Sequence, residues 1–186
     1  MTSDEILLET EDAMEKSVEY MTHEFASLRT GKASPALVDN IDVNAYGTSM
    51  KLKQLALIST PEPRLLVIQP FDASVIKDIE KGLIESKLGI TPSVDGKIIR
   101  LPIPELSEER RKDLVKAARH MAEEARVRVR GARRNGIDLV KKSEKDGEIT
   151  EDDRRGLEAE IQKLTDKYVK DVDQHLETKE MDIMKV

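Results

Sequence analysis

The chain has 186 residues, of which 37% are charged and 3% aromatic, and it contains neither Cys nor Trp. The lack of Cys excludes disulfides, thiolate metal sites and thiol nucleophiles, and the scarcity of aromatic side chains disfavours a broad sheet-sandwich core and favours helical packing. The formal net charge of −6 argues against indiscriminate binding to nucleic acid.

The first predicted element is a helix of nearly thirty residues. Residues 2–5 have the spacing of a capping box, and the apolar residues after them recur every three or four positions. Gly31 suits the C′ position of this helix, and Pro35 prevents its continuation. We therefore expect a helix that ends at Arg29. Its apolar stripe consists of Leu7, Met14, Val18, Met21, Phe25 and Leu28.

From residue 31 to about residue 104 the pattern changes to alternation interrupted by turn signals. Residues 41–46 alternate and end at a turn that contains Gly47, and residues 65–68 are typical of a buried strand. Short strands are also suggested by four further apolar residues. These are Leu52, Leu55, Leu57 and Ile58.

The second half of this segment predicts a short helix and a hairpin. Asp72 is expected to cap the helix and Gly89 to close it, and residues 95–96 are a hairpin turn signal. The segment is therefore expected to form a small α+β domain. The apolar residues expected inside its helix are Val75, Ile76, Ile79, Leu83 and Ile84.

Ser107 is expected to cap a helix of about forty residues that ends near Asp146. One side of it is an apolar seam of mostly small residues, and another side is a row of cations in which Glu123 is the one acid. Residues 107–147 hold 13 Lys and Arg against 8 Asp and Glu, in a chain that is otherwise acidic. The seam consists of Val115, Ala118, Ala122, Ala125, Val129, Ala132, Gly136 and Val140. The row of cations, called the basic stripe below, consists of Lys112, Lys116, Arg119, Arg126, Arg130, Arg133 and Lys141, with Arg134 at its edge.

A third helix is expected to follow at once. Residues 146–147 form the turn, and residues 150–153 cap the new helix. Because this connection is short, the second and third long helices should be antiparallel neighbours. The seam of the third helix consists of Leu157, Ile161, Leu164, Tyr168, Val172, His175 or Leu176, and Ile183.

These elements predict a two-domain α+β protein, in which a long antiparallel three-helix bundle is interrupted by a small β/α/β domain. The bundle is expected to comprise residues 1–30 and 106–186, and the inserted domain residues 31–105. Both connections, near residues 29–35 and 101–107, are strand-like and therefore predict a hinge.

The basic stripe has two interpretations. It can be a solvated helix face with i,i+4 ion pairs, or a surface for phosphates, which Arg126, Arg130 and Arg133 can grip bidentately. Few acids interleave with it, which favours the second, and the lack of aromatic residues fits structured RNA better than single strands. Arg110 and Arg128 fall on the other flank of the seam, where structural pairs or a second RNA surface are expected.

The sequence offers no constellation for catalysis. His23, His120 and His175 lie on three different helices without a metal-ligand pattern, and no Gly-rich phosphate loop occurs. We therefore expect a protein that is not an enzyme and has no catalytic residue, metal or cofactor. The start of the chain has no signal or transit character and no apolar run approaches a membrane span, so we expect a soluble cytoplasmic protein without membrane contact.

Four motifs together resemble the bacterial ribosome recycling factor family over the whole chain. They are Arg29-Thr-Gly-Lys-Ala-Ser-Pro35, Leu106-Ser-Glu-Glu-Arg-Arg-Lys-Asp-Leu114, Ala125-Arg-Val-Arg-Val-Arg-Gly-Ala-Arg-Arg134 and Ile149-Thr-Glu-Asp-Asp-Arg154. The resemblance implies an L-shaped protein that binds the large ribosomal subunit after peptide release. With elongation factor G, it would split the ribosome so that mRNA and tRNA leave. Lys32 stands where that family usually has Arg.

The resemblance also implies roles for particular residues. A monomer that contacts rRNA through the bundle and flexes at the junction is expected. The implied rRNA-binding residues are Arg29, Lys112, Lys116, Arg119, Arg126, Arg130, Arg133 and Arg134. The implied hinge residues are Thr30, Gly31, Lys32, Ala33, Ser34, Pro35, Pro102 and Pro104. The alternative is a coiled-coil adaptor whose basic stripe docks on an acidic protein surface.

Overall fold

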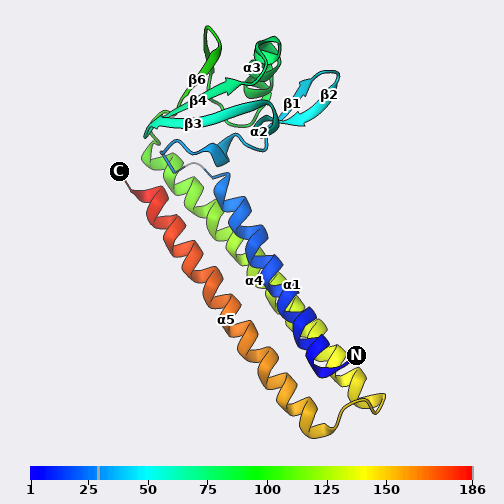
Figure 1. Cartoon of the computed structure of the whole chain (residues 1–186). Coiled ribbons are helices and arrows are strands. Elements are labelled where there is room, and N and C mark those ends of the chain that lie inside the picture. Colours follow the sequence, from blue (N-terminus) through cyan, green and yellow to red (C-terminus); the bar gives the residue numbers. More distant parts are fainter. Residues whose placement is uncertain (29, 186) are drawn as a thin grey trace. The chain divides into compact units, whose positions relative to one another are not determined.

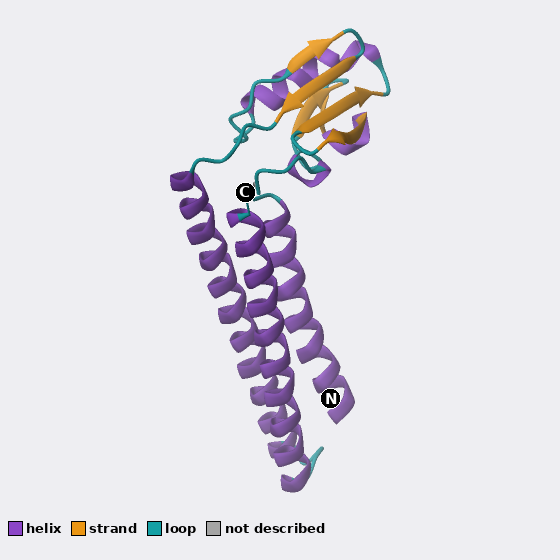
Figure 2. Ribbon diagram, turned by 90° about the vertical axis from the view of Figure 1, so that its left-hand side faces the viewer, coloured by secondary structure: helices purple, strands orange, loops and turns teal. Residues whose placement is uncertain are grey.

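The structure is a computed structural model that describes residues 1–28 and 30–185. The chain forms two compact units, each built from two stretches of sequence. The first unit comprises residues 1–25 and 115–182, and the second comprises residues 26–114 together with the chain from residue 183 onward. The first unit is helical and the second contains all the strands, so the predicted two-domain α+β class is confirmed (Figures 1 and 2).

Three long helices form the bundle, and they lie side by side in both views (Figures 1 and 2). They are α1 (Ser3–Ala26), α4 (Glu108–Lys145) and α5 (Glu151–Met184). The predicted capping boxes are confirmed, because Thr2 and Glu5 exchange backbone-to-side-chain hydrogen bonds of 2.8 and 3.2 Å, as do Thr150 and Asp153 at 3.0 and 3.2 Å. Ser107 caps α4 by accepting a hydrogen bond from the backbone of Arg110 at 3.1 Å.

Contacts between the helices set their directions. Pairs between α4 and α5 are nearly symmetric about the connection at residues 146–149, so these helices are antiparallel as predicted. The Tyr168 hydroxyl of α5 donates to Glu11 of α1 at 3.0 Å, and burial together with this bond raises the pKa of Tyr168 to about 12. All three helices meet at Gly136. A Cβ atom there would lie 2.5 Å from Thr10 Oγ1 and 3.2 Å from Ile161 Cδ1.

Most of the predicted seam positions are buried, but each helix requires corrections. On α4 Leu114 is buried rather than Val115, which is half-buried. On α1 the fully buried position is Ile6 rather than Leu7, which is half-buried, and the polar Thr10 belongs to the core. Thr10 tolerates burial because its hydroxyl donates to the Ile6 carbonyl at 2.7 Å.

On α5 Thr165 is buried rather than Leu164, which is half-buried. Of the two alternatives at the end of this seam, His175 is exposed and Leu176 is half-buried. These shifts follow from a helical phase that sparse apolar residues define only to within one position.

The first helix ends earlier than its sequence predicts. It ends at Ala26, so Gly31 is not its C′ residue. Gly31 nevertheless has a φ of +81°, a left-handed conformation that favours glycine. Arg29, the predicted last residue, lies outside the described residues.

The second unit contains two sheets. A hairpin of β1 (Asp42–Ala45) and β2 (Thr48–Lys51) is joined by Tyr46 and Gly47, both at positive φ, as the primed hairpin turns require. A four-stranded antiparallel sheet has the order β3-β4-β6-β5. Its strands are β3 (Ala56–Glu62), β4 (Leu65–Pro70), β5 (Ser93–Asp95) and β6 (Ile98–Pro102).

Helices complete the second unit and bring three corrections. The predicted short helix ends at Glu85, so Gly89 does not close it. Leu52 and Leu55 were expected in strands but lie in a helical turn, α2 (Leu52–Leu55). Ile84 was expected inside but is 60% exposed. The remaining helices are the 3-10 turns η1 (Pro35–Leu37) and η2 (Ala73–Val75) and the helix α3 (Ile76–Glu85).

Asp72 caps the second of these turns by accepting from Ser74, as its position predicts. Helix α3 packs closely on the β1 strand, because a Cβ on Gly82 would lie 3.0 Å from Val43 Cγ2. A single apolar core joins the strands and helices of this unit.

Candidate nucleic-acid interface

The basic stripe lies along α4, the helix that carries the apolar seam on another side (Figure 1). Most of its side chains are exposed, as is Arg134, but Arg126 and Arg133 are half-buried. Lys112 pairs with Glu108 in the first turn of α4, with 3.2 Å between Nζ and Oε1. Cations that sit on a rigid helix at spacings of three, four, seven and eight residues form a linear row, which suits the regularly spaced phosphates of a nucleic-acid backbone.

Helix α5 supplies acids to two arginines of the stripe. Arg119 Nε lies 2.6 Å from Glu180 Oε1, and Arg126 donates from Nε and Nη2 to Asp173 Oδ1 at 2.9 and 2.6 Å. The bond to Glu180 raises the pKa of Arg119. Desolvation opposes the charge of Arg126, but the hydrogen bonds to Asp173 and to Glu123 outweigh it and raise the pKa overall. These two arginines therefore also brace α4 against α5.

Glu123 bridges two members of the stripe. Its Oε2 atom accepts from Arg126 Nη1 at 3.1 Å, and its Oε1 atom accepts from Arg130 Nη2 at 2.8 Å. The hydrogen bonds from Arg130 and then from Arg126 lower the pKa of Glu123, which is thus charged at neutral pH. The bridging carboxylate occupies donors that an external anion would need.

The remaining cations are less engaged. Arg133 donates from Nη1 to Gln162 of α5 at 3.1 Å, a neutral partner that leaves its charge uncompensated. Within residues 1–28 and 30–185, Lys116, Arg134 and Lys141 make no ion pair. Within the basic stripe and the described residues, the uncompensated positive charge is thus carried by Arg133, Arg134 and Lys141 in the second half of α4, with Lys116 apart from them.

The expectation that few acids interleave with the stripe is correct within α4. It is wrong for the folded surface, because α5 contributes acids beside the stripe. Asp173, Glu180 and Gln162 were missed because each lies on a helix remote in sequence. In two antiparallel helices, positions equally far before and after the connecting turn lie opposite each other. Counting outward in both directions from the predicted turn at residues 146–149 therefore indicates which part of α5 faces each arginine of α4.

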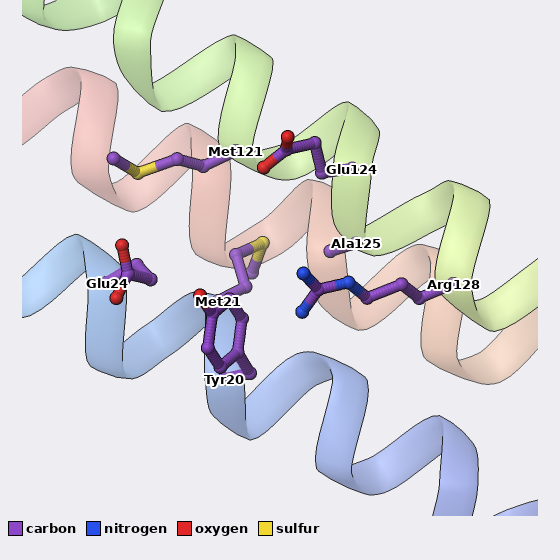
Figure 3. A pocket seen from close by; sticks show the side chains of 7 residues that line it. All are labelled: Tyr20, Met21, Glu24, Met121, Glu124, Ala125 and Arg128. Carbon is purple, nitrogen blue, oxygen red and sulfur yellow. The ribbon is translucent and has the colours of Figure 1, made fainter.

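The other flank of the seam faces α1. The Arg128 guanidinium stacks on the Tyr20 ring with 4.3 Å to the ring centroid, so Arg128 makes a structural contact, one of the two roles expected for it. Figure 3 shows this pair beside a small pocket between the two helices. Arg110 is exposed. The pocket is lined by Tyr20, Met21, Glu24, Met121, Glu124, Ala125 and Arg128.

Half of the predicted hinge residues are held by backbone or capping hydrogen bonds, or by sheet pairing, within the second unit. The backbone N–H of Ala33 donates to the Pro63 carbonyl at 2.7 Å, and Ser34 caps the η1 turn that Pro35 opens. Pro102 is paired with Leu65 in the sheet. Thr30 and Lys32 lie with Gly31 in the segment before this anchor, and Pro104 follows β6 outside any strand or helix. The predicted contact residue Arg29 lies outside the described residues.

Other kinds of site lack support in the described part of the chain. No three His, Cys, Asp or Glu side chains within it gather closely enough to hold a metal ion. None of its helices is both long and apolar enough to cross a membrane.

Comparisons with known proteins agree with one another. The sequence model described as ribosome recycling factor matches residues 21–184. The chain is 57% identical over 188 aligned positions to the ribosome-recycling factor of Akkermansia muciniphila, with both chains covered completely, and 52% identical to that of Rubrobacter xylanophilus, with 97% of each covered.

Two solved structures are also similar. One is a solution structure of a ribosome recycling factor, with a TM-score of 0.79, 42% identity and coverage of 99% of this chain and 98% of that one. The other is a model of the Thermus thermophilus ribosome recycling factor that, together with Escherichia coli elongation factor G, is bound to the Escherichia coli post-termination complex. Its TM-score is 0.68 at 45% identity, and the coverage is 99% of this chain and 100% of that one.

Proposed function

Because the chain belongs to the ribosome recycling factor family, we propose that it binds the large ribosomal subunit after termination and splits the post-termination complex with elongation factor G. The release of mRNA and tRNA follows from this splitting. The support is the similarity to a recycling factor bound with elongation factor G to the post-termination complex. The protein contributes binding and movement rather than catalysis, and nucleotide hydrolysis belongs to the partner.

The observation that carries the RNA-binding part is the uncompensated charge on α4. Arg133 has only a neutral side-chain partner, and Arg134 makes no ion pair within the described residues. Arg130 is 46% exposed and is paired only with Glu123 of its own helix. Guanidinium groups in this state can grip phosphate oxygens in pairs without reading base sequence. Arg119 and Arg126 contribute less to affinity in this proposal, because carboxylates of α5 already hold them.

The proposed mechanism assigns one task to each unit. The helical unit anchors on rRNA through α4, and the second unit receives the force from elongation factor G. The segment at residues 30–32, which follows the unit boundary after residue 25, transmits that force, since the neighbouring Ala33 and Ser34 are already hydrogen-bonded within the second unit. Motion of a rigid helical rod against the subunit then breaks contacts between the subunits.

The test is salt-dependent binding to purified large subunits. Replacement of Arg130 and Arg133 by Ala should weaken binding and reduce the slope of log affinity against log salt by about one unit per lost phosphate contact. Arg128→Ala is the control for each single replacement, because it removes one positive charge from the same helix on the flank that faces Tyr20. Helicity should change little, since Ala is a good helix former.

Two results would reject this assignment. An unchanged salt slope in the double variant would place the RNA-binding surface elsewhere on the protein. A wild-type protein that does not sediment with large subunits at low salt would favour the adaptor alternative.

A further inference from the structure

We propose that Glu123 limits the affinity of the basic stripe for RNA, because it occupies Arg126 and Arg130 with a carboxylate that a phosphate has to displace. This inference rests on the proposed function, since it concerns the same surface. It assigns to the one acid of the stripe a role in the release of the protein from the ribosome.

The geometry of Glu123 is that of a resident anion. Its two carboxylate oxygens are divided between two guanidinium groups, at 3.1 Å from Arg126 Nη1 and 2.8 Å from Arg130 Nη2. A phosphate that bridged the same arginines would use two oxygens in the same way. Glu123 itself is 55% exposed, so an incoming phosphate and its counterions reach this position from solvent.

The two arginines depend on Glu123 to different degrees. Arg126 is 21% exposed and is held independently by Asp173, which accepts from both Nε and Nη2. Arg130 is 46% exposed, and its one ion pair within the described residues is the bond to Glu123. Loss of the carboxylate therefore frees Arg130 for phosphate without releasing the brace between α4 and α5.

Glu123 has two opposing effects on affinity. It orders the Arg130 side chain, but an ion pair between exposed side chains contributes little free energy, so the gain in affinity from this ordering is small. It also repels a phosphate bound a few ångströms away, which at the dielectric of the water around this exposed carboxylate corresponds to roughly a three- to tenfold loss of affinity. Repulsion is the larger effect, so the net action of Glu123 is to weaken binding.

Weaker binding serves a factor that acts repeatedly. Each protein molecule has to leave the large subunit before it can act on another ribosome. Differences in affinity among variants of one interface fall mostly in the dissociation rate. Glu123 should accordingly speed departure more than it slows arrival.

The experiment compares Glu123→Gln with Glu124→Gln in the full chain. The glutamine side chain in Glu123→Gln keeps an amide oxygen that can accept from one arginine, but it has no charge. Glu124 is the matched control, since it is one residue away on α4 and pairs at 3.5 Å with His120 instead of with the stripe. Glu123→Asp keeps the charge and should behave as the wild type does.

Binding to purified large subunits should tighten about three- to tenfold in Glu123→Gln. The salt slope should steepen by about one unit, because Arg126 and Arg130 then exchange more counterions with RNA. Dissociation should slow, so splitting should be normal in a single turnover and reduced over many turnovers. Glu124→Gln should match the wild type in each measurement.

Three outcomes would overturn the inference. An unchanged affinity and slope in Glu123→Gln would mean that the carboxylate does not compete with phosphate, and weaker binding would mean that it positions Arg130. An equal gain in Glu124→Gln would reveal an effect of net charge alone. Failure of the proposed surface is distinguishable, because binding would then also be insensitive to the loss of Arg130 and Arg133.

Discussion

Gly136→Ala is predicted to destabilise the helical unit, although Ala is the better helix former. An added Cβ atom would lie 2.5 Å from Thr10 Oγ1, 2.9 Å from Thr10 Cγ2 and 3.2 Å from Ile161 Cδ1. Thr10 cannot easily turn away, because it is β-branched, 3% exposed and hydrogen-bonded through its hydroxyl to the Ile6 carbonyl at 2.7 Å. Helix α1 would therefore have to move outward.

The magnitude follows from two opposing contributions. Overpacking of a core typically costs about 1–3 kcal/mol. Replacement of Gly by Ala in the interior of a helix stabilises the folded state by about 1 kcal/mol. The net expectation is a loss of up to about 2 kcal/mol, which the urea midpoint of the helical circular dichroism signal can measure.

Gly131→Ala is the matched control on the same helix. Nothing lies within 4 Å of a Cβ at Gly131, so this variant should benefit from the higher helix propensity of Ala without a clash. Its free energy of unfolding should rise by about 0.5–1 kcal/mol. Thr10→Ala should rescue Gly136→Ala, because it removes both atoms that lie closer than 3.0 Å. A coupling energy of about 1–3 kcal/mol in the double-mutant cycle is expected.

The reasoning would be refuted by a Gly136→Ala variant as stable as Gly131→Ala. A destabilised variant that Thr10→Ala did not rescue would move the clash to Ile161.

Two further predictions concern the ends of the bundle. Arg154, which is 22% exposed, pairs at 2.9 Å with both Glu144 and Glu158, so Arg154→Gln should lower the urea midpoint. Arg155→Gln, which loses one exposed pair with Glu151, should leave the midpoint unchanged. An equal effect of the two variants would contradict a stabilising role for the ion pairs of Arg154. Gly31→Val should be strained by about 1 kcal/mol or more at its φ of +81°, and should keep large-subunit binding while it loses splitting with elongation factor G. Gly89→Val, at a φ of +66° with open space around it, controls for strain alone, and a proportional loss of binding and splitting in Gly31→Val would argue against the hinge.

The architecture could be predicted because periodicity and capping residues agree. Thr150 and Asp153 predict the start of a helix from their side-chain types and spacing alone, and the structure contains the corresponding pair of capping hydrogen bonds. Short apolar runs are less informative. Leu52 and Leu55 lie in the same apolar-rich run as Leu57 and Ile58, which suggests strands. Their three-residue spacing nevertheless fits one helical turn, and the structure has a helix there.

The candidate site could be predicted only in part. The cations of α4 follow from spacing, but their charge state depends on residues elsewhere in the chain. Asp173 neutralises Arg126 from α5, and no local pattern around residue 126 indicates this. Ranking the arginines by how strongly they are already paired therefore requires the structure.

The position of α1 in the chain has a consequence for biosynthesis. Its contact with α5 joins residues 157 positions apart, so α1 is made long before its partners exist. The contacts between α4 and α5 are local by comparison and can form first. Meanwhile the apolar side of α1 is uncovered as the chain leaves a ribosome whose surface is largely RNA. Eight acidic residues against one lysine give this helix a strong negative charge, which keeps it soluble and repels it from phosphate until α4 and α5 arrive.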